Sequence, residues 1–207
     1  MNGGERIMME RKHKKLGITI IVIVAVVALL VCLVIQQTRN GVSVNNFSYL
    51  INDVEQLTLD DYIANCSDIN DDKFLYLRYD NRFPSKDAND YREIAIYADI
   101  NNTSFFNYNL YDSYISDSNN NSIICFAITN SFQEKVESVS NKEYVYIMSL
   151  FIYIGDKKSD DTDQYIKDNM NNWTIDTYFY NKLFKNNKYT YCLADEKIEQ
   201  LSKNPYE

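Results

Sequence analysis

The chain begins with a uniformly apolar segment, and beyond it apolar and polar residues alternate. Residues 16–35 contain no charged side chain and one polar side chain, Thr19. At a rise of 1.5 Å per residue, a helix of this length spans about 30 Å, the thickness of a bilayer's hydrocarbon core. The pattern therefore predicts a transmembrane helix over residues 16–35, in contact with membrane lipid.

Charges beside this segment predict its orientation. Five cations precede it: Arg6, Arg11, Lys12, Lys14 and Lys15. Because Lys and Arg are retained on the cytoplasmic side, we expect a single-pass cell-membrane protein with a cytoplasmic N-terminus and an extracellular C-terminus. The expected parts are a cytoplasmic tail (1–15), the helix (16–35), a polar stalk (36–44) and one extracytoplasmic domain (45–207).

Two other roles for the apolar segment stay open. A cleaved signal peptide has an apolar region of about 7 to 15 residues and a cleavage site of small residues. Here the run is longer, and it ends with Val34 and Ile35. A lipoprotein carries a small residue before its modified Cys, whereas Val31 precedes Cys32. We therefore favour the uncleaved anchor.

Beyond the stalk, the period of the apolar residues changes from helical to two. Apolar spacing predicts a helix over 45–57, and the capping-box pattern Thr58–Asp61 predicts a second through Ala64. Further helices are expected at 159–169 and 195–203. Strands are expected at 74–79, 94–100, 105–111, 122–129, 143–154, 173–180 and 189–193. We expect 122–129, apolar on both faces, as a central strand and 143–154 at the middle of the main sheet.

About seven strands separated by turn signals favour a mainly-β external domain, a β-sandwich. The expected helices that precede the sheet leave an alternative open, an α+β fold with helices packed on one curved sheet.

The tail, helix, stalk and strand end at 98–104 (Ala-Asp-Ile-Asn-Asn-Thr-Ser) resemble the membrane-anchored immunoglobulin-like extracytoplasmic domains of Gram-positive bacteria. The resemblance covers about residues 92–180. It implies an immunoglobulin-like sandwich and a binding or accessory role.

Charge and composition exclude several classes of function. The formal charge is −8 in total and +3 over residues 1–15, so the remainder carries −11 and disfavours nucleic acid as a partner. His13 is the only His, which excludes His-dependent triads and zinc sites from the domain. Beyond the helix only Gly41 and Gly155 remain, which excludes glycine-rich phosphate loops. We therefore predict no enzyme, no cofactor and no catalytic or metal-binding residue.

Carboxylates and cysteines leave weaker possibilities. Four strand-flanking carboxylates would serve a carboxylate-dependent envelope hydrolase: Glu93, Glu134, Glu137 and Glu143. Residues 68–72 begin like a calcium loop, but Lys73 stands where Gly is required. Cys66 and Cys192 are a candidate disulfide, and Cys125 is expected to be buried; the alternative is three reduced thiols.

The favoured function is a non-enzymatic, membrane-anchored binding or accessory module that faces a protein or cell-envelope partner. The alternatives are the hydrolase and a small subunit of a membrane assembly or sensor. A flat sheet face rich in Tyr would favour binding. A deep cleft with two carboxyls about 5 to 10 Å apart would favour hydrolysis.

Overall fold

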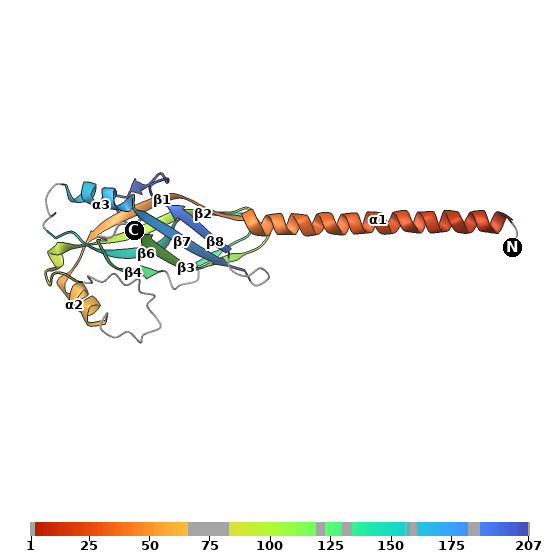
Figure 1. Ribbon diagram of the computed structural model, residues 1–207. Helices are drawn as coiled ribbons and strands as arrows, with labels where there is room; N and C mark the ends of the chain where they lie inside the picture. Colours follow the sequence, from red (N-terminus) through yellow and green to blue (C-terminus); the bar gives the residue numbers. More distant parts are fainter. Residues whose placement is uncertain are drawn as a thin grey trace. The chain divides into compact units, whose positions relative to one another are not determined.

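The computed structural model describes residues 3–65, 83–118, 123–129, 134–155, 157, 161–181 and 187–206. The chain divides into two compact units, Met1–Gly41 and Val42–Glu207. Helix α1 (Gly3–Asn40) makes up the first unit, and the second is mainly β (Figure 1).

Helix α1 is apolar on all sides over residues 16–35. The span Lys15–Ile35 has a mean hydropathy of 3.6, and none of its residues is buried. It is long and apolar enough to cross a membrane, and an apolar helix near the N-terminus can also be a signal sequence. The helix continues to Asn40 and the first strand begins at Val42, so helix and strand occupy most of the stretch expected as a stalk.

The first sheet has five strands in the order β4-β6-β2-β1-β9. They are β1 (Val42–Asp53), β2 (Tyr91–Asn102), β4 (Ile124–Thr129), β6 (Ser140–Tyr153) and β9 (Glu199–Gln200). The pairs within β4-β6-β2-β1 are antiparallel, and the short β9 pairs with β1 in parallel.

The second sheet has four antiparallel strands in the order β5-β3-β7-β8. They are β3 (Tyr108–Asp117), β5 (Glu134–Val136), β7 (Trp173–Tyr180) and β8 (Asn187–Cys192). One hydrophobic cluster contains Ile94 and Leu150 of the first sheet together with Ile115 and Trp173 of the second. The two sheets therefore share a core.

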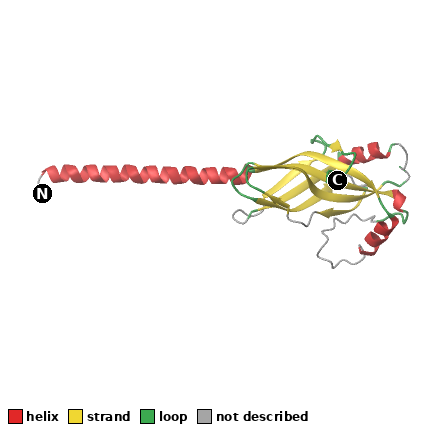
Figure 2. Cartoon of the chain, turned by 180° about the vertical axis from the view of Figure 1, so that it is seen from behind, coloured by secondary structure: helices red, strands yellow, loops and turns green. Residues whose placement is uncertain are grey.

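A smaller cluster lies on the other face of the first sheet. It includes Leu59 of α2 (Gln56–Asn65), Tyr91 of β2, Cys125 of β4 and Phe151 of β6. Gln56 ties the start of α2 to the 3-10 turn Ala88–Asp90, because its Oε1 accepts a hydrogen bond from the N–H of Ala88 at 3.1 Å. Figure 2 shows how small the helical share of this unit is.

The remaining helix, α3 (Thr162–Met170), contributes Ile166 and Met170 to the shared core. Several expectations are confirmed: one N-terminal apolar helix, a mainly-β body, α2 and α3. The segment expected at the middle of the main sheet, 143–154, falls largely in β6, which lies between β4 and β2, whereas β2 is the middle one of the five described strands. The alternation in β7 is also confirmed, since Trp173, Ile175 and Phe179 are buried.

The helix expected over 45–57 is wrong, because strand β1 extends to Asp53. Phe47, Tyr49 and Ile51 face the core at a period of two. Their spacing also fits part of a helical stripe, and ten paired positions along β2 decide between the two patterns. Long-range pairing has overridden the local signal here.

Two further expectations are wrong. Among the described strands, β4 is at an edge of the first sheet, and its apolar faces have separate partners: Ile124 and Ala127 join the shared core, whereas Cys125 joins the α2 cluster. The terminal helix over 195–203 is replaced by turns and β9, where the N–H of Leu201 donates to the carbonyl of Tyr49 at 2.8 Å. The strand expected at 74–79 lies outside the described residues.

Candidate functional site

The strands of the first sheet deviate from regular pairing around Asp99. Pairing of β1 with β2 shifts between Asn45 and Ser48, and pairing of β2 with β6 shifts between Ala98 and Ile100. Such bulges re-aim side chains and occur beside functional sites. Asp99 therefore lies where the pairing of β2 is irregular with both of its neighbours, β1 and β6.

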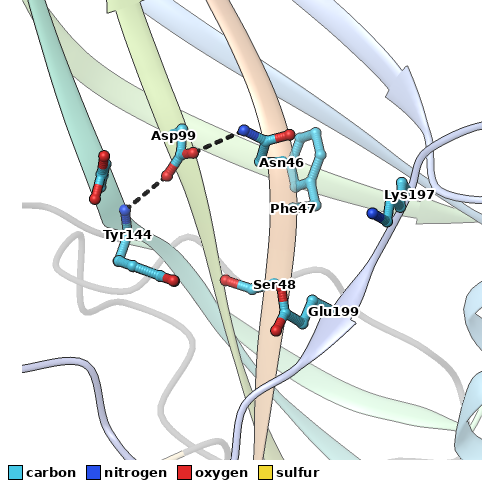
Figure 3. Close-up of a pocket in the computed structure, with 8 residues that line it drawn as sticks. Asn46, Phe47, Ser48, Asp99, Tyr144, Lys197 and Glu199 are labelled. Carbon is cyan, nitrogen blue, oxygen red and sulfur yellow. Dashed lines mark hydrogen bonds between the residues drawn. The ribbon is translucent and has the colours of Figure 1, made fainter.

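Asp99 joins three strands through its carboxylate. Oδ2 accepts a hydrogen bond from Nδ2 of Asn46 on β1 at 2.9 Å, and Oδ1 accepts from the N–H of Tyr144 on β6 at 3.0 Å (Figure 3). Both donors belong to residues with positive φ, 49° at Asn46 and 53° at Tyr144. Non-glycine residues with positive φ are uncommon. Asp99 accepts a hydrogen bond from each of these two residues, and these bonds favour the two conformations.

A hollow of about 260 Å³ opens over this junction. Its lining residues are Asn46, Phe47, Ser48, Asp99, Glu143, Tyr144, Lys197 and Glu199. Lys197 and Glu199 come from the C-terminal segment that runs beside β1, and the side chain of Tyr144 extends toward Ser48 (Figure 3). The lining carries three carboxylates and one ammonium group, so its net charge is negative.

The C-terminal segment also holds the strand that carries Tyr144. The hydroxyl of Tyr206 donates to the carbonyl of Tyr144 at 2.7 Å, and its ring lies 6.1 Å from that of Tyr97. Burial raises the pKa of the neighbouring Tyr146 to about 12. This phenol therefore stays neutral near pH 7 and acts as a hydrogen-bonding group rather than as a base.

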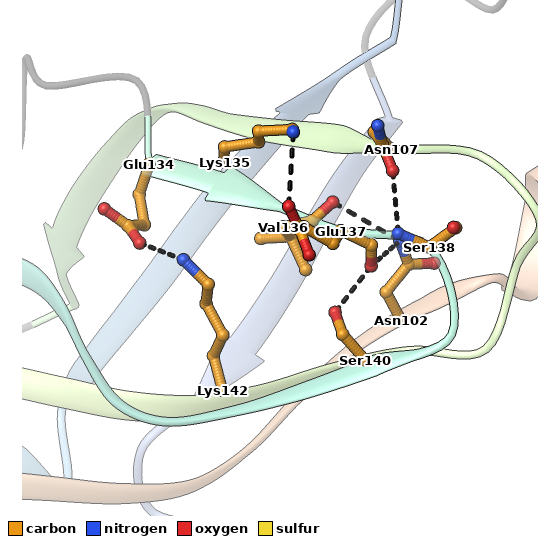
Figure 4. Close-up of polar contacts among 9 residues, drawn as sticks. All are labelled: Asn102, Asn107, Glu134, Lys135, Val136, Glu137, Ser138, Ser140 and Lys142. Carbon is orange, nitrogen blue, oxygen red and sulfur yellow. Dashed lines mark hydrogen bonds and ion pairs between the residues drawn. The ribbon is translucent and has the colours of Figure 1, made fainter.

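A second network joins two loops at the end of β2. Asn102 is fully buried, and its Nδ2 donates to the carbonyls of Phe106 and Glu137, each at 2.8 Å. Its Oδ1 accepts from the N–H of Ser104 at 3.0 Å. The N–H of Ser138 donates to Oδ1 of Asn107 at 2.8 Å (Figure 4). The network is structural, because its polar atoms bond to one another.

The face of the second sheet that points away from the core combines aromatic and polar side chains. The rings of Tyr114 on β3 and Tyr178 on β7 meet edge to face, with their centroids 5.4 Å apart. Tyr180, also on β7, is 37% exposed. Asp176 accepts a hydrogen bond from Oγ1 of Thr190 at 2.5 Å and pairs with Lys188 at 2.8 Å. Rigid tyrosines set among polar groups are common in binding surfaces.

The structure separates the four carboxylates singled out in the sequence. Glu134 pairs with Lys142, and Glu137 pairs with Lys135. Glu93 lies opposite Phe151 in the first sheet, and only Glu143 lines the hollow. In the described part of the chain, no three His, Cys, Asp or Glu side chains are grouped so that they could hold a metal ion.

The predicted disulfide stays a prediction, because Cys66 lies outside the described residues; Cys192 is half-buried at the end of β8. Cys125 is buried, as expected. The calcium-like stretch 68–72 also falls outside the described residues. Sequence reasoning missed Asp99 and the hollow, because the bulges that create them depend on pairing between distant strands.

Comparisons of this chain with protein-family models, with curated proteins and with solved structures give no match.

Proposed function

We propose that this chain is a non-enzymatic binding module, anchored in the cell membrane by α1, that presents its mainly-β domain to a protein or cell-envelope partner. The observation that carries the proposal is the apolar surface of α1. Its large side chains over Leu16–Ile35 are 39% to 68% exposed. A surface of this kind is costly in water and stable in lipid.

The Lys and Arg residues that precede the helix support a cytoplasmic N-terminus and a domain outside the cell. The bilayer core then contains residues 16–35, whose only polar side chain has an internal partner: Oγ1 of Thr19 donates to the carbonyl of Lys15 at 2.9 Å. A hydroxyl satisfied within its own helix is tolerated in lipid.

The fold of the domain is proposed to be an immunoglobulin-like β-sandwich. The constant-type arrangement has strands A, B, E and D on one sheet and C, F and G on the other. Naming β1, β2, β3, β4, β6, β7 and β8 as A to G in chain order gives A-B-E-D and C-F-G, which agrees with the observed strand orders. The strand β5 is then an addition beside C, and α2 belongs to an insertion between A and B.

One departure from that family concerns its disulfide. Antibody domains join strands B and F by a disulfide, whereas β2 and β7 contain no Cys. Trp173, on β7, is fully buried in the core that the two sheets share. The match therefore rests on strand order.

The binding role is supported by the outer face of the second sheet, where Tyr114, Tyr178 and Tyr180 stand among Asp176, Lys188 and Thr190. Such a face was the feature expected of a binding module. Aromatic side chains that are held in place lose little entropy when they bind a partner.

The test is alkaline extraction of membranes from cells that make the full chain with an N-terminal tag. An uncleaved anchor predicts that the tagged, full-length chain stays in the membrane pellet, because carbonate releases peripheral proteins and leaves spanning helices in place. Loss of the tag from the mature protein would indicate a cleaved leader, and release of the full-length chain would contradict the anchor.

A further inference from the structure

We infer that the domain docks on the lipid surface of the membrane proposed to hold α1, through two apolar loop tips, Phe105 and Val139. Phe105 belongs to the loop between β2 and β3, and Val139 belongs to the turn between β5 and β6. The surface that they contact is the headgroup layer of a phospholipid bilayer. The inference rests on the proposed anchor and adds a second membrane contact, made by the domain itself.

The first observation is the exposure of the two tips. In the described part of the domain, three large apolar side chains other than tyrosine are exposed: Leu57, Phe105 and Val139. Phe105 is 75% exposed and Val139 is 69% exposed. The N–H of Val139 donates to the carbonyl of Ser104, the residue before Phe105, at 3.1 Å. The two tips are therefore held next to each other, and exposed apolar side chains that gather in this way mark a contact with a membrane or a protein.

The second observation is the end of the sheet at which the tips lie. Val42, the first residue of β1, pairs with Asn102 at the end of β2, and Asn102 pairs with Ser140 at the start of β6. Both tips lie in the connections that begin or end at this row. Val42 follows Ile35, the last residue of the apolar span, by seven positions, so the chain holds it within about 25 Å of Ile35. This end of the sheet therefore stays near the bilayer at any angle between the two units, and lipid is the partner within reach.

The backbone of both loops is suited to a surrounding with little water. Nδ2 of Asn102 donates to the carbonyls of Phe106 and Glu137 (Figure 4). The N–H of Phe106 donates to Oγ of Ser104 at 3.1 Å, and the N–H of Val139 is bonded to the same residue. Because unpaired backbone groups are costly where water is scarce, loops with internally bonded groups can approach lipid at low cost.

Val139 adopts a conformation that its residue type disfavours. Its φ is 47°, and positive φ is a genuine outlier for a side chain branched at Cβ. Glycine or asparagine would adopt this conformation at lower cost. Strained residues cluster at functional positions, and contact with lipid gives a reason for an apolar side chain at this turn.

Charge also favours this end of the domain. The two loops, 103–107 and 137–139, contain one charged residue, Glu137, and it pairs with Lys135 at 3.3 Å. The chain beyond residue 15 is otherwise strongly acidic. Because the negative surface potential of a membrane repels acidic surfaces, contact is least opposed where the loops carry no uncompensated charge.

The experiment places a tryptophan at the tip of the full chain, which is reconstituted in phosphatidylcholine vesicles with acyl chains brominated near the headgroups. Bromine quenches tryptophan fluorescence on contact. Trp173 is the only native Trp and is fully buried, so the unsubstituted chain supplies the background. Phe105→Trp should lose fluorescence in brominated vesicles relative to vesicles of the unbrominated lipid.

Leu57→Trp is the matched control. Leu57 is 77% exposed and lies in α2, beyond the other end of β1, whose twelve residues span about 40 Å. A tryptophan at this position should be as accessible to water as one at Phe105, and its fluorescence should be the same in both kinds of vesicle.

A further variant separates lipid contact from folding. Val139→Asn removes the apolar side chain and suits a positive φ, so the melting temperature in micelles should stay the same or rise. Added to Phe105→Trp, it should shift the docking equilibrium about tenfold toward the free domain, and quenching should fall. A purely structural role for Val139 predicts the reverse, a lower melting temperature with unchanged quenching.

Flotation of the vesicles, measured on the same samples, separates the two proposals. If the chain does not float with the lipid, the anchor fails and this inference falls with it. If the chain floats and Phe105→Trp is quenched no more than Leu57→Trp, the docking inference alone is overturned, and the tips are left to a protein partner.

Discussion

At the scale of single residues, the most informative groups are hydroxyls buried in the shared core. Ser113 lies opposite Thr177, and Thr177 lies opposite Tyr189, in a row across the second sheet. The side-chain oxygens of Ser113 and Thr177 lack hydrogen-bond partners in the described part of the chain. Each therefore reduces stability relative to an apolar group of the same shape.

The Thr177→Val substitution should raise the free energy of unfolding by about 1 kcal/mol, because it replaces an unpaired buried hydroxyl by a methyl group. Urea unfolding of the full chain in micelles would measure it. Thr190→Val is the matched control: Thr190 is exposed and donates to Asp176, so this change should be neutral or slightly destabilising. A loss of stability in Thr177→Val would show that its hydroxyl is satisfied, for example by a buried water.

At the scale of elements, the loops at the end of β2 and the turn after β5 act as one unit through Asn102. Its buried amide bonds to the backbone of Phe106 and Glu137, and its carbonyl oxygen bonds to Ser104. Two strand connections are therefore held by one side chain.

We expect Asn102→Ala to lower the free energy of unfolding by about 2 to 3 kcal/mol, because several buried polar groups lose their partner together. Asn101→Ala is the control at the adjacent residue. Asn101 is half-buried and makes no side-chain hydrogen bond in the described part of the chain. Its effect should stay within about 0.5 kcal/mol. Equal effects of the two substitutions in thermal or urea unfolding would contradict the role given to Asn102.

Local pattern was sufficient for elements whose apolar side chains face one core. β7 could be predicted because Trp173, Ile175 and Phe179 alternate with polar residues. β1 could not, because its stripe fits two periods and only pairing with β2 decides between them. The edge position of β4 was equally hidden, since its second apolar face packs on α2 rather than on another sheet.

The candidate site was beyond prediction for a related reason. Asp99 is an ordinary residue within the predicted strand 94–100 and its turn, and nothing local marks it. Its role depends on Asn46 and Tyr144, which lie 53 and 45 residues away along the chain. Carboxylates chosen because they flank strands proved to be ion-paired with neighbours, as Glu134 and Glu137 are.

At the scale of the whole molecule, the account depends on the side of the membrane that the domain occupies. Residues 1–15 are basic and the domain is acidic, so the two ends of the chain differ sharply in charge. The proposed orientation of the anchor rests on the Lys and Arg residues of this first stretch. The proposed function therefore requires the domain to lie outside the cell.

The most direct test is protease treatment of intact cells that make the chain with a C-terminal tag. With the domain outside, protease should remove the tag and the domain while a cytosolic marker protein survives. In control samples without active protease, the tag should remain intact. Survival of the tag in intact cells, followed by its digestion once the cells are opened, would place the domain in the cytoplasm and contradict the account.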